Sequence, residues 1–363
     1  MGFKCGLVGL PNVGKSTIFN KLTNLNISAE NFPFCTIKPN FGITLVSDDR
    51  LKTLSNIVNS DCIIPTYIEL VDIAGLVKGA CQGEGLGNKF LNHIKETDLI
   101  IHVVRGFKDD KISHVYGRVN PVEDIEIINL ELILSDFDVC KNRIQKLKQK
   151  NYVLFKKNID REIKILNYCL TCLKSNKFLK FSNLTLEEIK VIEHLKFITL
   201  KPIMYVVNTS INVKNNVCIK KVLDLSKKEK SFVSLVCVDS EFGNDTYEQE
   251  KENLNYKELN FVAFGLNSIA IFGYKLLRLK SFFTVGEKEV HAWTTKSDVT
   301  IKESVKCIHT DLSVGFIRAQ VISYVDFVKF GGEKNTKKFG KVRMEGKNYY
   351  INDGDIINVL YKI

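Results

Sequence analysis

The sequence lacks any apolar run as long as a membrane span, and nothing in it resembles a leader peptide. Its first residues, Met1-Gly2-Phe3-Lys4, lead directly into a short strand-like run that ends at Val8. We therefore expect no membrane association and a cytoplasmic protein. The composition, with 45% hydrophobic and 26% charged residues, is ordinary for a globular chain, and 363 residues suffice for two or three domains.

A cysteine-based metal site is also missing from the sequence. The chain has 10 cysteines, but the one C-x-x-C pair, Cys169 and Cys172, lies in a helix-like pattern without a second Cys or His pair. A tetrahedral zinc site needs four ligands, so this pair alone cannot complete one. We expect the cysteines to be reduced and packed, as is usual in an intracellular enzyme.

The most informative stretch that is present runs from Gly9 to Ser16 and reads G-x-x-x-x-G-K-S. It follows an apolar strand-like run over residues 3–8 and precedes a helix-like segment over residues 17–22. Glycines at both ends allow successive amide groups to point at phosphate oxygens, and the helix start adds partial positive charge. Lys15 would bind the β- and γ-phosphates, and the Ser16 hydroxyl would bind Mg²⁺. The pattern thus predicts a phosphate-binding loop.

A second motif, D-x-x-G, begins at Asp72 and ends at Gly75, directly after a strand-like run over residues 66–71. In nucleotide switches an aspartate at such a strand end lies near Mg²⁺, and the glycine amide lies near the γ-phosphate. Residues 77–89 contain four glycines, which is typical of a segment that orders with bound nucleotide.

Further apolar runs predict a doubly wound parallel sheet. They cover residues 98–104, 202–207 and 231–238, and they alternate with helix-like segments. Ligands of such sheets bind at the carboxyl ends of the strands, so we expect Asn12, Asp72 and Asn208 to share one site. His102 lies within the first of these runs and is expected to be a packed strand residue.

Two basic regions stand outside this sheet. Residues 124–195 contain no proline and read as mostly helical, and the part from Lys141 to Lys164 has nine basic and two acidic residues. After Asn267 the chain changes to short strand-like runs separated by turn residues, which predicts a small β-rich domain. There Lys329 to Lys347 holds seven basic and two acidic residues, and the whole chain has a formal charge of +11. This excess favours an anionic partner such as RNA, with solvated surface lysine as the alternative.

The motifs together resemble the YchF or Obg-like ATPase family of P-loop proteins. The stretches that carry the resemblance are residues 1–6, 9–16, 31–37, 71–79, 83–88, 102–105, 308–311 and 315–320. The resemblance implies an Obg-type G domain over residues 1–255, interrupted by a coiled-coil insertion over 124–197. A connecting segment over 256–278 and a β-grasp TGS domain over 279–363 would complete the chain.

The family also implies functions and site residues. A member would hydrolyse ATP with Mg²⁺ as a monomer and associate with the ribosome, through the large subunit or the 70S particle, with basic surfaces touching rRNA. Residues matching its nucleotide site are Asn12, Val13, Gly14, Lys15, Ser16, Thr17, Gly75, Asn208 and Thr209. Ser16, Thr36 and Asp72 match the metal positions.

The catalytic positions implied by the resemblance are Lys15 and His114. Leu76 stands where many GTPases place a glutamine that orients water, and an apolar side chain cannot do this. The family assigns that role to a loop histidine that matches His114. Slow basal turnover is expected for a site of this kind.

The base-reading loop departs from the family pattern, because Ile211 replaces a glutamate. Without a carboxylate the guanine donors lose a partner, and an unmet buried donor costs about 1–3 kcal/mol. This argues against strong guanine preference, although it does not establish adenine preference.

Three functions remain open from the sequence. The leading one is Mg²⁺-dependent ATP hydrolysis, the second is a ribosome-binding switch in which hydrolysis is only a reset, and the third is a GTPase translation factor. A small-molecule kinase is the least favoured, since D-x-x-G belongs to switches.

Overall fold

The computed structural model describes residues 2–24, 40–73, 86–109, 113–149, 156–209, 216–237 and 262–362. The chain forms two compact units. The larger comprises residues 4–42 and 70–268, and the smaller comprises residues 1–3, 43–69 and 269–363.

The larger unit is built on a seven-stranded sheet with the strand order β2–β4–β1–β5–β6–β7–β8. The strands are β1 (Lys4–Val8), β2 (Phe41–Leu45), β4 (Tyr67–Asp72), β5 (Leu99–Arg105), β6 (Ile203–Asn208), β7 (Val233–Val236) and β8 (Val262–Phe264). From β1 to β8 every neighbouring pair is parallel. All residues of β5 and β6 are buried, which explains why both strands read as continuous apolar runs.

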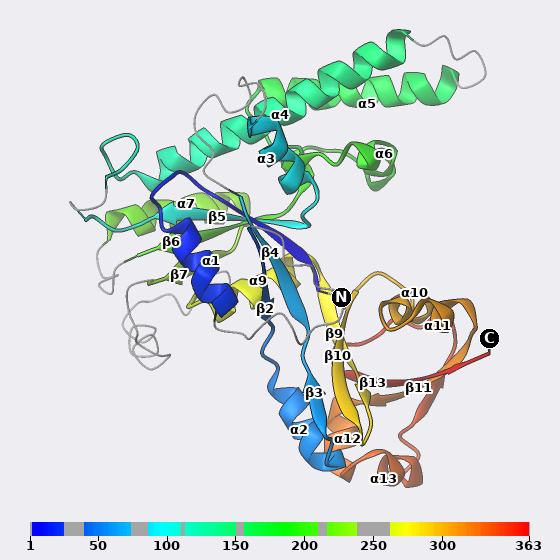
Figure 1. Ribbon diagram of the computed structural model, residues 1–363. Coiled ribbons are helices and arrows are strands. Elements are labelled where there is room, and N and C mark those ends of the chain that lie inside the picture. Colours follow the sequence, from blue (N-terminus) through cyan, green and yellow to red (C-terminus); the bar gives the residue numbers. More distant parts are fainter. Residues whose placement is uncertain are drawn as a thin grey trace. The chain divides into compact units, whose positions relative to one another are not determined.

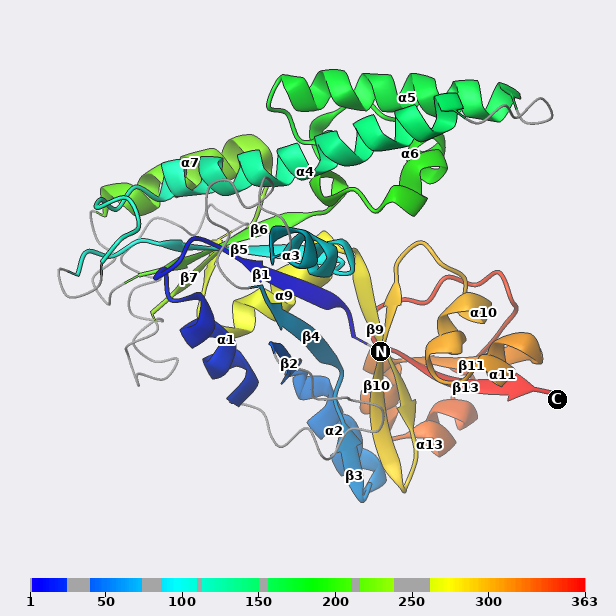
Figure 2. The ribbon, with the colours of Figure 1, turned by 45° about the horizontal axis from the view of Figure 1, so that its top comes forward.

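Helices cover both faces of this sheet, so the doubly wound α/β prediction is confirmed. Figure 2 shows α4 (Pro121–Gln149) and α7 (Val217–Glu229) on one face and α1 (Lys15–Asn24) on the other. In α1 the buried Ile18 and Leu22 are four residues apart, which gives this helix one apolar stripe toward the sheet.

The helical region predicted after residue 124 begins slightly earlier, at Pro121, a residue well suited to a first helical position. Helix α4 runs for 29 residues, and α5 (Lys156–Lys174) packs beside it as an antiparallel partner (Figure 1). Arg143 of α4 makes two hydrogen bonds to Glu162 of α5, at 2.8 and 3.2 Å. Shorter helices complete this region: η2 (Leu179–Phe181), α6 (Leu186–Ile192), η3 (Glu193–Leu195) and η4 (Ile198–Leu200). Helix α3 (Leu86–Lys95) precedes β5.

The smaller unit contains a mixed six-stranded sheet with the order β12–β11–β13–β9–β10–β3. Its strands are β3 (Cys62–Ile64), β9 (Leu279–Val285), β10 (Glu289–Lys296), β11 (Phe316–Ser323), β12 (Arg343–Glu345) and β13 (Asp355–Tyr361). Its helices are α2 (Asp49–Val58), α9 (Asn267–Leu276), α10 (Ile301–Ser304), η6 (Val305–Cys307), α11 (Thr310–Val314), α12 (Tyr324–Phe330) and α13 (Glu333–Lys338). The first two residues of α9 belong to the larger unit, because the last segment of the smaller unit begins at Ile269. The short strands expected after Asn267 are present, but the short helices among them were not predicted.

The smaller unit also takes up residues 43–69, which the sequence analysis assigned to the G domain. Strand β3 pairs in parallel with β10, and α2 buries Leu51 and Leu54 against Phe283. Arg50 donates to Asp353 at 2.7 Å and lies 5.0 Å above the Phe283 ring. These contacts join residues more than 220 positions apart, so no local pattern could indicate them.

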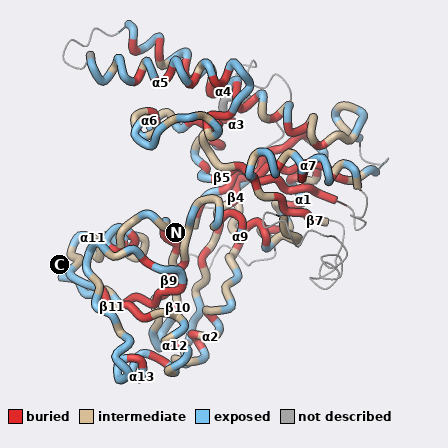
Figure 3. Tube along the Cα trace, turned by 180° about the vertical axis from the view of Figure 1, so that it is seen from behind, coloured by how far each residue is buried: buried red, intermediate tan, exposed pale blue. Residues whose placement is uncertain are grey.

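Burial follows the two sheets, as the red strands in Figure 3 show. Among the helices that the structure describes, none combines the length and the apolar character that crossing a membrane requires.

Candidate active site

The loop between β1 and α1 has the backbone that the glycine pattern predicts. Asn12 and Gly14 both have positive φ, at 63° and 88°. A side chain on Gly14 would overlap the Asn208 amide nitrogen, and one on Gly9 would lie 2.5 Å from the Val103 carbonyl oxygen. Both glycines are therefore required by close packing at the carboxyl ends of β1, β5 and β6.

Three predicted residues meet at one point of this loop. The Lys15 ammonium forms an ion pair with the Asp72 carboxylate, and the Ser16 hydroxyl donates to the other Asp72 oxygen at 3.1 Å. The Lys15 and Asp72 side chains are only 7% and 12% exposed. Asp72 ends β4 and its amide donates to the Asn40 carbonyl at 2.8 Å, which fixes the carboxylate beside the loop.

The pair of oxygens on Ser16 and Asp72 fits a magnesium ion. Mg²⁺ prefers hard oxygen ligands and usually keeps waters and substrate phosphates in its shell, so two protein ligands suffice. In the described part of the chain, no group of three or more His, Cys, Asp or Glu side chains could hold a metal by itself. The chemistry therefore suits a metal that arrives with a phosphate ligand. Thr36 and Gly75, also predicted for this site, lie outside the described residues.

Asn208 connects the end of β6 to the phosphate loop. Its buried side-chain amide donates to the Val13 carbonyl at 3.0 Å, and its own carbonyl accepts from the Gly106 amide at 2.7 Å. Thr209 is 3% exposed and donates its amide to the Val236 carbonyl at 2.8 Å. The structure thus brings Asn208 to the predicted site, with Thr209 next to it. Ile211 and Leu76 lie outside the described residues.

The other residues predicted for the phosphate loop differ in how far they are exposed. Val13 is buried, whereas Asn12, Ser16 and Thr17 are exposed. The Asn12 side-chain amide donates to the Ser113 carbonyl at 3.3 Å, so the loop that carries the candidate histidine touches the phosphate loop.

His114 is held by hydrogen bonds on both ring nitrogens. Its Nδ1 accepts from the Tyr116 amide at 3.2 Å, so the ring proton is assigned to Nε2, which donates to Asp124 at 3.0 Å. Both side chains are almost fully buried, at 4% and 3% exposure. Burial raises the pKa of the Asp124 carboxyl, and the hydrogen bond from His114 opposes that rise. In this conformation neither nitrogen of His114 is free to accept a proton from water.

Three residues that shape the site were not predicted from the sequence. Asp124, in the first turn of α4, orients His114. Arg105 ends β5, is 1% exposed, and donates to the carbonyls of Phe107 and Asp109 at 3.1 and 3.0 Å. Asn216 caps α7 and donates to the Gly106 carbonyl at 2.7 Å. A charged residue directly after a buried strand was the available signal for Arg105; the partner of Asp124 could not be read from spacing.

His102 is a packed strand residue, as predicted. It is 1% exposed, lies 5.8 Å from the Tyr205 ring, and has no hydrogen-bond partner among the described residues. Burial lowers its pKa to about 3, so the imidazole is neutral.

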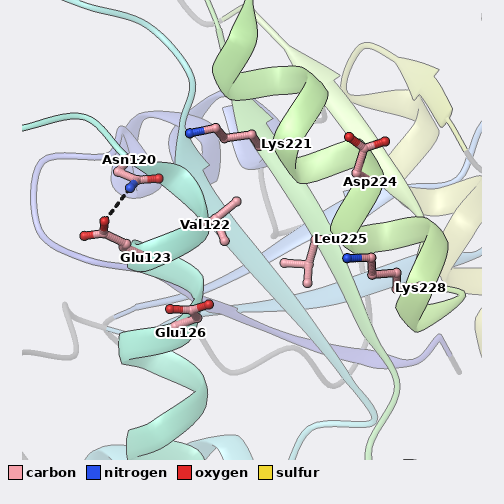
Figure 4. Close-up of a pocket in the computed structure, with 8 residues that line it drawn as sticks. All are labelled: Asn120, Val122, Glu123, Glu126, Lys221, Asp224, Leu225 and Lys228. Atoms are coloured by element: carbon pink, nitrogen blue, oxygen red, sulfur yellow. Dashed lines mark hydrogen bonds between the residues drawn. The ribbon is translucent and has the colours of Figure 1, made fainter.

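A separate pocket of about 380 Å³ lies between the start of α4 and α7 (Figure 4). Charges of both signs line it, with Glu123 and Glu126 on the α4 side and Lys221 and Lys228 on α7. None of the phosphate-loop residues lines it, so it is distinct from the site built around Lys15.

Comparisons with known proteins agree with this geometry. Residues 4–136 match the family model of 50S ribosome-binding GTPases. Residues 279–362 match a model named YchF-GTPase_C, described as a protein of unknown function.

Full-length relatives are also known. The chain is 54% identical to the ribosome-binding ATPase YchF of Buchnera aphidicola subsp. Baizongia pistaciae over 366 residues, covering all of both proteins. It is 47% identical to the ribosome-binding ATPase YchF of Escherichia coli O157:H7 over 364 residues, again with full coverage. The solved structure of the Schizosaccharomyces pombe YchF GTPase matches with a TM-score of 0.83 at 30% identity, covering 99% of this chain and 98% of that one. The bacterial relatives are thus named ATPases and the fission yeast protein a GTPase.

Proposed function

The chain belongs to the YchF family of P-loop proteins, and from this membership we propose that it is a ribosome-binding ATPase that uses Mg²⁺. The observation that carries the proposal is the meeting of Lys15, Ser16 and Asp72 at the start of α1. A charged amine, a hydroxyl and a carboxylate at one helix start are the groups that a magnesium–triphosphate complex needs. A protein that works on ribosomes acts in the cytoplasm.

Binding of the triphosphate requires an exchange of partners at Lys15. Its ammonium leaves the Asp72 carboxylate for the β- and γ-phosphates, where the loop amides also donate. Ser16 and Asp72, together with Thr36, would hold the metal directly or through water. When bound, Mg²⁺ neutralises charge that develops on the β- and γ-phosphate oxygens.

His114 positions or activates the attacking water in this proposal. Because Nε2 donates its proton to Asp124, Nδ1 is the nitrogen that can accept a proton, and the loop must rearrange to free Nδ1 from the Tyr116 amide before it can face the attacking water. Asp124 acts as the positioning residue, since it holds the ring through Nε2 while Nδ1 is released. The need for this rearrangement agrees with slow basal turnover.

The base is recognised near Asn208 and Thr209, with backbone groups deciding between purines. Ile211 offers guanine no carboxylate, which favours ATP. The name of the fission yeast relative makes a GTPase the second candidate.

The ribosome is contacted through basic surfaces, on the large subunit or the 70S particle, by a monomer. The α4–α5 hairpin supports this part, because exposed Lys141, Lys148, Lys157 and Lys164 lie along it. If binding were the output, hydrolysis would serve only as a reset.

Competition between ATP and GTP for a fluorescent triphosphate tests the proposal. We expect ATP to compete at least tenfold better than GTP. Ile211→Glu should leave the binding of ribose triphosphate, which has no base, unchanged. Equal or stronger competition by GTP would replace the ATPase with the GTPase. Co-sedimentation with ribosomes, with and without ATP, then separates a switch from an ATPase whose binding ignores the nucleotide.

A further inference from the structure

The turn between α12 and α13 in the smaller unit is held by hydrogen bonds from its own side chains, and most of its residues are exposed. Gly331 ends α12 with φ 69°, and Gly332, with φ 113°, begins α13. The buried Thr336 hydroxyl donates to the Gly332 carbonyl at 2.8 Å, and the Asn335 amide donates to the Phe330 carbonyl at 3.0 Å. Most of α13 is exposed, as its mainly pale blue trace in Figure 3 shows. We call residues 329–341 the elbow.

Two phenylalanines of the elbow form a stack that faces solvent. The rings of Phe330 and Phe339 lie 4.6 Å apart and are inclined by only 20°. Phe330 is partly buried, whereas Phe339 is 64% exposed. Because one face of the Phe339 ring packs on Phe330, its other face is a flat apolar surface held in a fixed orientation.

The same segment carries a strong positive charge. It has five exposed lysines and one acid, and the lysines are Lys329, Lys334, Lys337, Lys338 and Lys341. None of these lysines forms an ion pair with a carboxylate among the residues that the structure describes. Lys329 also places its ammonium 5.5 Å from the Phe330 ring centroid. A fixed aromatic face within a ring of lysines is what unpaired nucleic acid requires, because one base can stack while flanking phosphates meet the charges.

We propose that the elbow binds an unpaired segment of RNA, with one base stacked on the outer face of Phe339. A double helix would satisfy the lysines, but its stacked bases could not reach the ring. The inference rests on the proposed ribosome association and narrows one contact to unpaired rRNA.

Fluorescence anisotropy of the full-length protein with two RNAs tests this assignment. One is a hairpin with an unpaired purine loop, and the other is a fully paired duplex of equal length. We expect Phe339→Leu, which keeps an apolar side chain but removes the aromatic face, to weaken loop binding about tenfold. Duplex binding should stay within about twofold, since Phe339→Leu keeps all the lysines of the parent protein.

Phe339→Trp should restore loop binding, because it restores a stacking surface. Phe181→Leu is the matched control: this phenylalanine is 37% exposed and has the Lys180 ammonium 4.5 Å from its ring, but it lies in η2 of the larger unit. The control should bind both RNAs like the parent protein.

The assignment is overturned if Phe339→Leu leaves loop binding unchanged, or if the parent protein prefers the duplex or binds neither RNA. Ribosome co-sedimentation, measured in parallel, distinguishes the two proposals. If the parent protein sediments with ribosomes and Phe339→Leu affects only that sedimentation, the elbow contacts a ribosomal protein and the RNA assignment is wrong. If the parent protein does not sediment with ribosomes, the proposed function fails, whatever the oligonucleotides show.

Discussion

Single residues at the phosphate loop are constrained by their neighbours more than by their own chemistry. Gly14 combines a positive φ with contact to the Asn208 amide, so two separate costs oppose any side chain there. The Asn208 amide is in turn bound to the Val13 carbonyl, and displacing it would release the loop.

Gly14→Ala should therefore weaken triphosphate binding at least tenfold, or about 1.4 kcal/mol, in a titration with a fluorescent nucleotide. Gly340→Ala is the control, since Gly340 has a positive φ of 66° but nothing within 4 Å of a new side chain. The control variant has the backbone strain of an alanine at positive φ but no steric clash, and it should bind nucleotide normally. Equal losses in both variants would contradict the role given to Asn208.

His114 and Asp124 form the second residue-scale unit. If the histidine places or activates water, His114→Ala should reduce kcat by about a hundredfold while nucleotide affinity stays unchanged. Asp124→Asn should cause a smaller loss and alter the pH dependence of kcat, because the ring is then held by a neutral partner.

Steady-state phosphate release across pH provides the measurement for this pair. The exposed His309, in the smaller unit, supplies the control His309→Ala, which should match the parent at every pH. Unchanged turnover in His114→Ala would remove the histidine from the mechanism.

At the scale of elements, the central strand β5 buries a titratable group, His102, that has no hydrogen-bond partner among the described residues. His102 has a folded pKa of about 3, below the 6.5 expected for an unfolded chain. Between these values the unfolded state binds the proton, so stability is fully present above pH 6.5 and is lost as pH falls.

We expect the free energy of unfolding to drop by about 2 kcal/mol between pH 7.5 and pH 5 because of this one group. His102→Phe, which cannot bind a proton, should remove that part of the loss, as measured by urea unfolding at both pH values. His309→Phe changes an exposed histidine and should keep the parent's pH dependence. An unaltered acid sensitivity in His102→Phe would show that His102 is not responsible.

The elements that sequence could predict are those with a local signal. Strand β1, the glycine loop and α1 follow one another within 24 residues, and β5 and β6 are unbroken apolar runs. Helices α10 to α13 have only four to seven residues, too few to show helical periodicity. Their capping residues, such as Thr300 with Glu303, were the one available signal.

The candidate site shows the same division. Lys15, Ser16 and Asp72 were predictable because phosphate and magnesium chemistry fixes their types and spacing. The role of Asp124 was not predictable, and Arg105 offered only the signal of a charge at the end of an apolar run, since both roles depend on partners that only the folded chain brings close. Residues 43–69 join the smaller unit through distant contacts, such as those of β3 with β10 and of Arg50 with Asp353, which have no sequence signature.

At the scale of the whole molecule, the formal charge of +11 is unevenly used. Lysines are clustered in the α4–α5 hairpin and in the elbow, whereas the phosphate loop has a single lysine, Lys15. Ribosome association through the hairpin should therefore depend on salt.

Replacing Lys141, Lys148 and Lys157 by glutamate should weaken ribosome co-sedimentation and flatten its dependence on salt concentration. The control has three lysine-to-glutamate substitutions on α7 instead, at the exposed Lys220, Lys227 and Lys228, and so changes the total charge equally. If both triple variants lose binding equally, net charge alone explains the association, and the hairpin has no special part in it.

The central claim is that Lys15, Ser16 and Asp72 together grip a magnesium–triphosphate complex. Calorimetric titration of ATP into the parent protein, Lys15→Met and Asp72→Asn, each with and without Mg²⁺, tests it most directly. The parent should bind more tightly with the metal, Asp72→Asn should lose that gain, and Lys15→Met should lose binding under both conditions. Affinity that ignores magnesium in the parent, or that survives in Lys15→Met, would contradict the claim.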